Sequence, residues 1–318
     1  MKNYRIGVDI GGTSFKYGIV DEEGKILFKS SYLVNHQVSQ EEQIIELGRS
    51  ILSLMKKENI ALDDILGIGI GCPGSINPNT GYCDYSNNLR WNNLPVRDLL
   101  FTVIPKPIRI SNDANAATLG EARYGIGKGY HNIVMLTLGT GVGGGLILND
   151  QLYEGNEGKG AELGHTILHL NGRKCTCGRK GCIEAYASVR ALVDDTKKAM
   201  KKDQTSSLWK ACHDDLTKLN ARIIYKCAKE KDALANQMLN QYYEYLKETV
   251  LNYINIFRPE LLILGGGISA QKEHILSHLI PLIEKEHYGF GNGPKVKIEC
   301  ASLGNDAGII GAACLIEM

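Results

Sequence analysis

Apolar residues near the N-terminus alternate with polar ones in the manner of β-strands. Residues 4–9 and 15–20 predict two strands joined by a glycine turn, and residues 26–32 predict a third strand after the polar turn at 21–24. From residue 41 to residue 58 the apolar positions recur instead at the spacing of a helix. The pattern therefore predicts a β-meander followed by a helix.

Two more strand patterns end in small or polar residues. Residues 65–70 predict a buried strand that stops at 71–74 (Gly-Cys-Pro-Gly), and residues 108–111 predict a short strand that stops at Asn112 and Asp113. Asn and Asp cap helices well, and the alanines that follow them favour a helix. We therefore expect a helix to begin at this junction.

The opening pattern returns in the middle of the chain. Residues 133–138 and 143–148 predict two strands joined by a turn that contains Gly139, Thr140 and Gly141. This echo of the first hairpin predicts two related halves, and each glycine turn offers backbone N–H groups to a phosphate.

The remaining segments complete a two-domain prediction. Residues 186–256 are mostly helical by pattern, residues 261–264 predict a strand that ends in a triple glycine, and residues 305–315 predict a helix that folds back onto the first domain. We expect an α/β chain with a small N-terminal domain of residues 1–113, completed by a C-terminal helix of about residues 304–318, and a large domain of residues 114–303.

Composition and charge narrow the classes of partner. The 318 residues carry 36 Lys and Arg against 35 Asp and Glu, so the net charge is +1 and no basic stripe suits nucleic acid. The run 133–148 is shorter than the roughly 20 apolar residues of a spanning helix, and the N-terminus does not read as a signal peptide. Nine cysteines cannot all pair in disulfides. We expect a cytoplasmic protein that binds neither nucleic acid nor membrane.

The glycine turns are candidate phosphate-binding elements. Glycine lets the backbone approach an anion closely, a neighbouring hydroxyl and a lysine bind phosphate oxygens, and an aspartate holds Mg²⁺ through water. The residues concerned are Asp9, Gly11, Gly12, Thr13 and Lys16 in the first turn, Thr140 and Gly141 in the second, and Gly265, Gly266 and Gly267 in the third. One such turn alone would be read as a tight hairpin. Three of them at strand ends favour a nucleotide held in a cleft between two domains.

The spacing of these glycines excludes two common nucleotide motifs. The P-loop pattern Gly-x-x-x-x-Gly-Lys-Ser/Thr does not occur, and the first strand and turn lack the dinucleotide pattern Gly-x-Gly-x-x-Gly.

Three closely spaced cysteines predict a metal site. Cys175, Cys177 and Cys182 fall within eight residues, and His165 lies ten residues before the first of them. Three thiolates and one imidazole complete a closed tetrahedral site, which is typical of structural zinc. The alternative is a set of free thiols or a redox pair.

Acidic and amide side chains next to these elements are candidates for catalysis and sugar binding. Asp113 is a candidate base for a substrate hydroxyl and Asn112 can both donate and accept hydrogen bonds, although the pair also reads as a helix cap. Glu162 and Glu184 flank the metal ligands, so a metal would fix a loop that presents both carboxylates. Each hydroxyl of a bound polyol needs a donor and an acceptor, which such side chains supply.

Taken together, these residues resemble the ROK family of sugar kinases and sugar-responsive repressors, within the actin-like ATPase superfamily. The resemblance covers nearly the whole chain. The motifs that carry it are Asp9-Ile10-Gly11-Gly12-Thr13, Gly71-x-Pro73-Gly74, Asn88-Leu89-x-Trp91, Asn112-Asp113-Ala114-Asn115-Ala116-Ala117, Leu138-Gly139-Thr140-Gly141-Val142-Gly143-Gly144-Gly145, Glu162-x-Gly164-His165, Cys175-x-Cys177-Gly178-x-x-Gly181-Cys182-x-Glu184 and Leu264-Gly265-Gly266-Gly267. The His and Cys motif is highly specific, whereas single Gly-Gly-Thr turns are not.

The resemblance implies a two-domain actin-like (ribonuclease H-like) fold and a hexokinase-type reaction, in which ATP phosphorylates the 6-hydroxyl of a hexose. It implies that Asp113 is the general base. The residues that it implies for the other sugar hydroxyls are Gly74, Asn88, Asn112, Glu162, His165 and Glu184. It also implies that the first two glycine turns cradle the phosphates with Mg²⁺, that residues 265–267 back the adenosine, and that the protein is a homodimer.

The resemblance leaves the substrate open. Glucose is our first choice, and the alternatives are N-acetylmannosamine, N-acetylglucosamine, fructose, allose and mannose. Ser75 bears on this choice, and Asn87 competes with Asn88 for the sugar. Alternatives of another class are a sugar-sensing repressor of the same family, disfavoured because only eight residues precede Asp9, and a catalytically silent sugar-binding protein.

Overall fold

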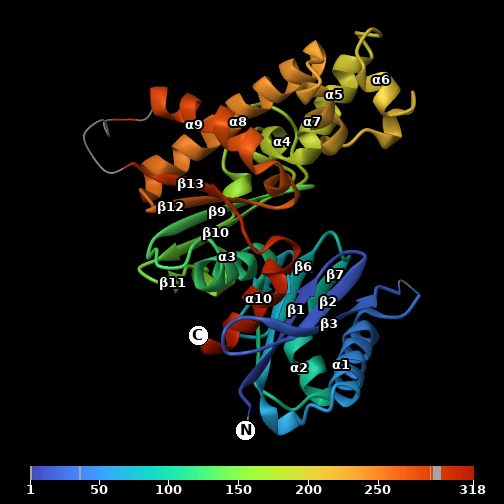
Figure 1. The fold of residues 1–318 in the computed structure, drawn as a ribbon. Helices are drawn as coiled ribbons and strands as arrows, with labels where there is room; N and C mark the ends of the chain where they lie inside the picture. Colours follow the sequence, from blue (N-terminus) through green and yellow to red (C-terminus); the bar gives the residue numbers. More distant parts are fainter. Residues whose placement is uncertain (1, 36, 287, 289–294) are drawn as a thin grey trace. The chain divides into compact units, whose positions relative to one another are not determined.

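The computed structural model describes residues 2–35, 37–286, 288 and 295–318. It is a mixed α/β chain whose contacts divide it into two compact units (Figure 1). The first unit comprises Met1–Ile133, Gly145–Ala161 and Asn305–Met318, and the second unit comprises Val134–Gly144 and Glu162–Gly304.

The first unit is built on a five-stranded sheet in the order β3-β2-β1-β4-β8. Strands β1 to β3 form the predicted antiparallel meander, whereas β4 and β8 continue the sheet in parallel with β1. The strands are β1 (Tyr4–Ile10), β2 (Ser14–Val20), β3 (Ile26–Leu33), β4 (Ile65–Cys72) and β8 (Ile108–Asn112). A separate small sheet contains β5 (Ser75–Asn77), β6 (Tyr82–Ser86) and β7 (Trp91–Leu94).

One face of the first sheet is apolar and packs against two helices. In β1 and β4 isoleucines and valine alternate with glycines, and side chains of alternate residues point to opposite faces of a sheet. The large side chains join one buried core with helices α1 (Gln40–Lys57) and α2 (Val96–Val103). Ser39 caps α1 by accepting a hydrogen bond from the N–H of Glu42.

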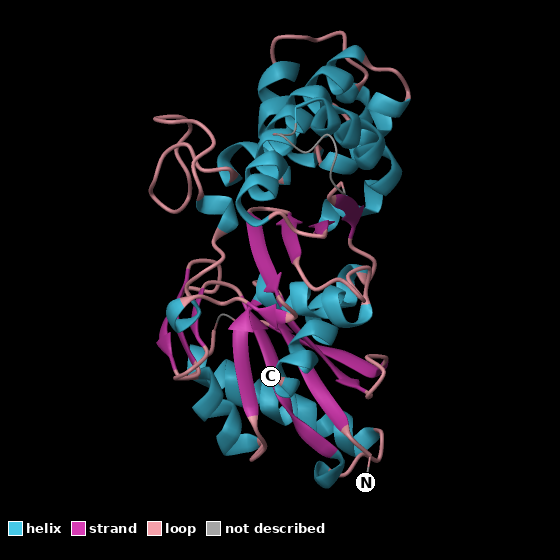
Figure 2. Ribbon diagram, turned by 90° about the vertical axis from the view of Figure 1, so that its left-hand side faces the viewer, coloured by secondary structure: helices cyan, strands magenta, loops and turns pink. Residues whose placement is uncertain are grey.

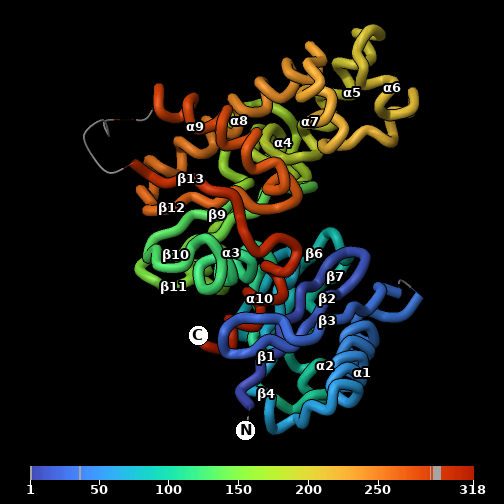
Figure 3. Tube along the Cα trace, viewed as in Figure 1, coloured from blue at the N-terminus to red at the C-terminus, as the bar shows by residue number. Residues whose placement is uncertain are grey.

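The glycine face of the same sheet accepts the C-terminal helix α10 (Ala307–Cys314). A Cβ atom at Gly7 or Gly69 would overlap backbone atoms of this helix, so only glycine lets α10 lie directly on β1 and β4. Helix α3 (Asp113–Tyr124) packs against α10. Figure 3 shows the C-terminal segment, in red, returning to the blue strand β1. The buried Arg5 forms an ion pair with Glu317, which fastens the chain just beyond α10.

The second five-stranded sheet repeats the connectivity of the first. Its order is β11-β10-β9-β12-β13, in which a meander is again extended by later strands. The strands are β9 (Ile133–Leu138), β10 (Val142–Leu148), β11 (Gln151–Leu152), β12 (Leu261–Gly265) and β13 (Lys297–Cys300). The predicted echo of the first hairpin is therefore confirmed.

The predicted helical segment of the second unit forms several separate helices (Figure 2). They are α4 (Glu184–Ala187), α5 (Val189–Met200), α6 (Leu208–Ala211), α7 (Ala221–Lys229) and α8 (Ala233–Phe257), and α9 (Lys272–Glu286) follows β12. Short 3-10 helices occupy Leu62–Asp64, Asn156–Gly158, Leu163–His165, Leu216–Lys218, Gly267–Gln271, Gly304–Asp306 and Leu315–Glu317.

The contact grouping differs from the expected division of the chain at residue 113. Residues 114–133 group with the first unit, since α3 packs against α10. The boundaries 1–113 and 114–303 stay a prediction about the family's domains. Among the residues that the structure describes, no helix is long and apolar enough to cross a membrane.

Candidate active site and metal centre

Three parallel strands of the first sheet bring candidate residues to one edge. Asp9 of β1 lies opposite Gly71 of β4, and Gly71 lies opposite Ser111 of β8. Because the strands are parallel, their carboxyl ends meet at this edge, where α/β sheets usually bind ligands. Asp9, the turn that follows it, and the pair Asn112 and Asp113 therefore share one side of the first unit.

The first glycine turn is a tight hairpin closed by its own backbone. The N–H of Gly11 donates to the carbonyl oxygen of Ser14 at 3.1 Å. A Cβ atom on Gly12 would lie 3.9 Å from the backbone oxygen of Asn88, so the turn lies close to this candidate sugar ligand. Thr13, Lys16 and Asn88 are exposed and accessible to a ligand.

The carboxyl group of Asp9 lies against the first turn of α10. A Cβ atom on Gly308 would be 2.7 Å from Cγ of Asp9. Burial raises the pKa of Asp9, and the nearby positive charge of Lys16 opposes this rise. A cation bound through water would favour the charged form of this carboxylate, which fits the predicted role of Asp9 toward Mg²⁺.

Asn112 and Asp113 both accept hydrogen bonds at the start of α3. Asn112 is the N-cap of α3, because its side-chain oxygen accepts from the N–H of Ala114 at 2.8 Å. Its amide nitrogen donates to the carbonyl oxygen of Gly74 at 3.2 Å, and Gly74 has a φ of 115° that favours glycine. Asp113 is the first residue of α3, and its Oδ1 accepts from the N–H of Ala114 at 2.9 Å.

The second and third glycine turns adjoin each other in the second unit. The N–H of Gly139 donates to the carbonyl oxygen of Gly141 at 3.0 Å. Gly266 has a φ of 81°, and a Cβ atom there would overlap the carbonyl oxygen of Leu138. Since β9 and β12 are neighbours in the sheet, the turn at 139–141 and the turn at 265–267 present their backbones side by side.

Glu184 links the second glycine turn to the cysteine motif. This buried carboxylate accepts from the N–H of Val142 at 3.2 Å through Oε2. Its other oxygen, Oε1, accepts from the hydroxyl of Thr176 at 2.7 Å. A Cβ atom on Gly141 would overlap Oε2, so the glycine permits this close approach. Both carboxylate oxygens thus help to hold the loop in place.

Glu162 is close enough to His165 and Glu184 to interact with their charges. Neighbouring atoms crowd its carboxyl group, although the side chain is exposed at the surface, and this desolvation raises the pKa of Glu162. His165 lowers that pKa and Glu184 raises it further. The three predicted sugar ligands of the second unit therefore lie together.

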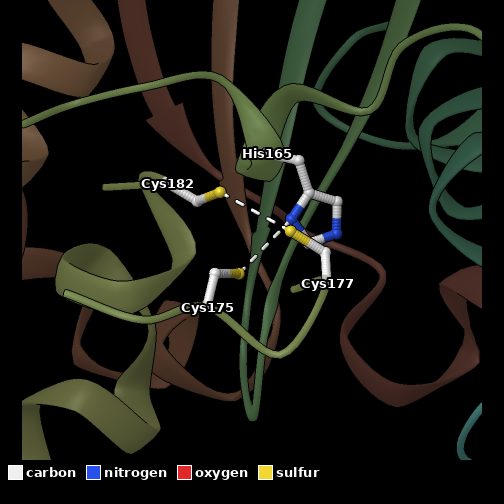
Figure 4. Close-up of side chains that lie close together, drawn as sticks. All are labelled: His165, Cys175, Cys177 and Cys182. Atoms are coloured by element: carbon white, nitrogen blue, oxygen red, sulfur yellow. Dashed lines mark hydrogen bonds between the residues drawn. The ribbon is translucent and has the colours of Figure 1, made fainter. Parts of the chain in front are cut away.

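The four predicted metal ligands converge. One ligand atom from each of His165, Cys175, Cys177 and Cys182 lies within 4.8 Å of the others (Figure 4). Zn–S bonds of about 2.3 Å in a tetrahedron place the sulfur atoms about 3.8 Å apart. The sulfur atoms of Cys177 and Cys182 are 3.7 Å apart, and Nδ1 of His165 is 3.7 Å from the sulfur of Cys175. The donor set and its spacing fit a structural zinc ion.

The two ring nitrogens of His165 face in different directions. Nδ1 faces the thiols, so Nε2 lies on the opposite side of the ring and points away from them. Two residues that sequence reasoning missed hold this turn: Arg179 donates to the carbonyl oxygen of His165 at 3.0 Å, and the buried hydroxyl of Tyr253 donates to the carbonyl oxygen of Leu163. Arg179 lies inside the cysteine motif, whereas nothing in the sequence pattern singles out Tyr253.

The sequence and the fold are similar to those of known proteins along nearly the whole chain. The glucokinase of Thermotoga maritima is 37% identical, with 98% of this chain and 96% of that protein covered. The xylose repressor of Caldicellulosiruptor bescii is 30% identical, with 98% of this chain and 77% of the repressor covered. The structure of a ROK family glucokinase from Streptomyces griseus, in complex with glucose and AMPPNP, matches with a TM-score of 0.84 and 30% identity, covering 98% of each chain.

The match to a family model agrees with these similarities and with the predicted motifs. The model of the ROK family covers residues 5–318. The fold is that of the actin-like sugar kinases, as the sequence predicted. The chain belongs to the ROK family.

Proposed function

We propose that the protein is an ATP-dependent sugar kinase that transfers the γ-phosphoryl group of ATP to the 6-hydroxyl of a hexose, with glucose as the substrate. Full-length similarity to proteins named glucokinase supports this proposal. The structural observation that carries it is the shared edge of the first sheet. There Asp9 lies near the carboxyl end of β1, a phosphate-type glycine turn follows that strand, and Asp113 directly follows β8, with β4 between the two strands.

Asp113 is the general base of the proposed reaction. Its carboxylate takes the proton of the sugar's 6-hydroxyl, the oxygen attacks the γ-phosphorus, and the bond to the β-phosphate oxygen breaks to release ADP. Positioning and charge neutralisation supply most of the rate in phosphoryl transfer. The position of Asp113 at the start of α3, fixed by the cap at Asn112, suits this role.

The other sugar hydroxyls need a ring of donors and acceptors. We assign this role to Gly74, Asn88, Asn112, Glu162, His165 and Glu184. Asn112 and Glu184 already use oxygen atoms within the protein, so they contribute the bonding capacity that remains. For His165 that leaves Nε2, which points away from the thiols, because Nδ1 faces them.

The glycine turns are assigned to binding of the nucleotide. Gly11, Gly12, Thr13, Lys16, Thr140 and Gly141 are assigned to the phosphates, and Gly265, Gly266 and Gly267 to the adenosine. Asp9 is the residue that would hold Mg²⁺ through water, and this ion neutralises phosphate charge when bound. The zinc ion proposed at His165 and the three cysteines is structural, since all four positions of a tetrahedron are filled by the protein.

The substrate and two further properties stay predictions. N-acetylmannosamine, N-acetylglucosamine, fructose, allose and mannose are the alternative sugars, because a pocket changes shape without a change in these motif residues. The homodimer stays a prediction from the family resemblance, and the cytoplasmic location stays a prediction from the sequence. A sugar-sensing repressor is the alternative of another class, because a xylose repressor is also similar to this chain in sequence.

The test is ADP release with Mg-ATP over a panel of glucose, mannose, fructose, allose, N-acetylglucosamine and N-acetylmannosamine. We expect the highest kcat/KM with glucose. Turnover that is fastest with another sugar would correct the substrate, and an absence of turnover with every sugar, from folded protein, would overturn the kinase.

A further inference from the structure

The segment between His165 and Cys175 is tied down by an arginine that the functional assignment does not use. The guanidinium carbon of Arg173 lies 4.4 Å from the ring centre of Tyr186. Its Nη1 donates to Asp195 at 2.7 Å and to the carbonyl oxygen of Ala185 at 3.2 Å. Arg173 therefore reaches from the metal-ligand segment to both α4 and α5. We call Arg173, Tyr186 and Asp195 the clamp.

The backbone of Arg173 is held as firmly as its side chain. Its N–H donates to the hydroxyl of Tyr186 at 2.7 Å, and its carbonyl oxygen accepts from the N–H of Gly181 at 2.7 Å. The second of these bonds joins the segment directly to the residue before Cys182. The ring of His169 also lies 4.7 Å from that of Tyr186, so a second side chain of the segment rests on the same tyrosine.

The surroundings make these contacts strong. Tyr186 is buried, and the side chains of Arg173 and Asp195 are 33% and 16% exposed. A charge-assisted hydrogen bond and a cation–π contact gain strength when water is partly excluded. The clamp thus holds its part of the segment by interactions that need no metal.

Tyr186 also lies next to the proposed sugar site. It is two residues after Glu184 in the single turn of α4, and Glu184 in turn binds the second glycine turn and Thr176. A displacement of α4 would move the carboxylate of Glu184 and the loop that carries the cysteines together.

We propose that Arg173 and Tyr186 are positioning residues. They hold the loop that carries the four metal ligands in its metal-binding geometry, and they keep the carboxylate of Glu184 in position to bind the sugar. The part concerning zinc stands on the geometry of the loop, and the part concerning the sugar rests on the proposed kinase function. Neither residue touches the reacting atoms.

The first test is zinc release from the full-length protein to a colorimetric chelator. Removal of a side chain that orients metal ligands typically weakens metal binding about 10–100-fold, so we expect Arg173→Met to accelerate zinc release by about tenfold or more. Arg173→Lys, which keeps the charge but loses the fork geometry, should give an intermediate rate. Arg222→Met, which removes an exposed arginine of α7, is the matched control and should release zinc at the wild-type rate.

The second test is the kinetic split on glucose. Arg173→Met should raise KM about fivefold or more while kcat changes less than about twofold, because sugar binding and not the base is displaced. Faster zinc release with an unchanged KM would overturn the link through Glu184. An unchanged zinc release rate in Arg173→Met, or purified wild type that binds no zinc, would overturn the role of the clamp at the metal loop.

A milder variant guards against a failure to fold. Tyr186→Phe removes only the hydroxyl that accepts from the N–H of Arg173, and circular dichroism checks its fold. We expect zinc release between the rates of wild type and Arg173→Met, and a wild-type rate in this variant would contradict the proposed contact. Wild type that phosphorylates no sugar would sink the kinase proposal, while zinc release would still test the clamp.

Discussion

The hydroxyl of Ser111 donates a hydrogen bond of 2.5 Å to the carboxylate of Glu154. Ser111 is buried in β8, directly before Asn112 and Asp113, whereas Glu154 follows β11. Both residues belong to the first unit, although 43 positions separate them in sequence. This bond therefore anchors the strand end that carries the proposed base.

Loss of this anchor should weaken both the fold and the reaction. Glu154→Ala leaves the buried hydroxyl of Ser111 without this partner, which costs about 1–3 kcal/mol of unfolding free energy. We also expect kcat to fall about tenfold, since small misplacements of a catalytic group are costly. Denaturant unfolding and steady-state kinetics measure the two effects. Glu157→Ala, which removes an exposed carboxylate of the same loop, should change neither, and equal losses in both variants would argue against the anchor.

Asp113→Asn should abolish most of the turnover. The amide keeps the size of the side chain but cannot take the proton of the sugar hydroxyl, so kcat should fall by about 100-fold to 10,000-fold. Sugar binding, followed by isothermal titration calorimetry, should change little. Asp98→Asn, in the first turn of α2, is the control for a lost carboxylate in a helix start. Near-normal turnover of Asp113→Asn would remove this residue as the base.

Cys177→Ser tests the metal centre. Cys177 is the exposed member of the four-ligand set, so its replacement disturbs packing least while it removes one thiolate. We expect the zinc content, measured by atomic absorption, to fall well below that of wild type, and the KM for sugar to rise as the loop loosens. Cys300→Ala removes a thiol outside the cluster and should retain full zinc. Equal zinc in wild type and Cys177→Ser would show that the ligand set is wrong.

A histidine on α9 should make the second unit less stable in acid. Nδ1 of His274 lies 2.9 Å from the hydroxyl of Tyr243 on α8, which in turn contacts Tyr225 on α7. Burial lowers the pKa of His274, and the charges of His278 and Lys229 lower it further. The folded protein therefore keeps this ring neutral at a pH where the unfolded chain has already bound a proton.

The sign of the effect follows from this difference in proton binding. As the pH falls through about 6.5, the unfolded chain gains the proton first, so unfolding free energy decreases until the pH passes the lowered pKa of the folded state. Denaturant unfolding at several pH values between 7.5 and 5 measures the slope. His274→Gln should flatten it, whereas His213→Gln, at an exposed position, should keep it. A wild-type slope in His274→Gln would assign the acid sensitivity elsewhere.

The spacing of apolar residues was enough to predict the strands and helices in which that spacing is regular or in which a capping residue marks the start. The strand at 133–138 has the predicted bounds, α1 runs over Gln40–Lys57, and Asn112 caps α3 as expected. The four metal ligands also converge as predicted, because their spacing is local and the turn residues between them are glycines. All of these features depend on residues that lie close together in the sequence.

Other features depend on partners far away in sequence, and local pattern does not contain them. The sheet β5-β6-β7 has strands as short as Ser75–Asn77, with polar residues that weaken any alternation. Glu154, Arg173 and Tyr253 look like ordinary polar or aromatic residues until the fold places Ser111, Asp195 and Leu163 beside them. Local pattern therefore identifies the four candidate metal ligands but not the residues that hold their surroundings in place.

The glycine face of the first sheet has a consequence for the order of events during synthesis. Helix α10 covers β1 and β4 by backbone contact, and Arg5 near the start of the chain pairs with Glu317. On the ribosome, the meander and its neighbouring strands emerge long before this helix does. Until the second unit has been translated, the glycine face of β1 and β4 therefore lacks the helix that covers it in the folded protein.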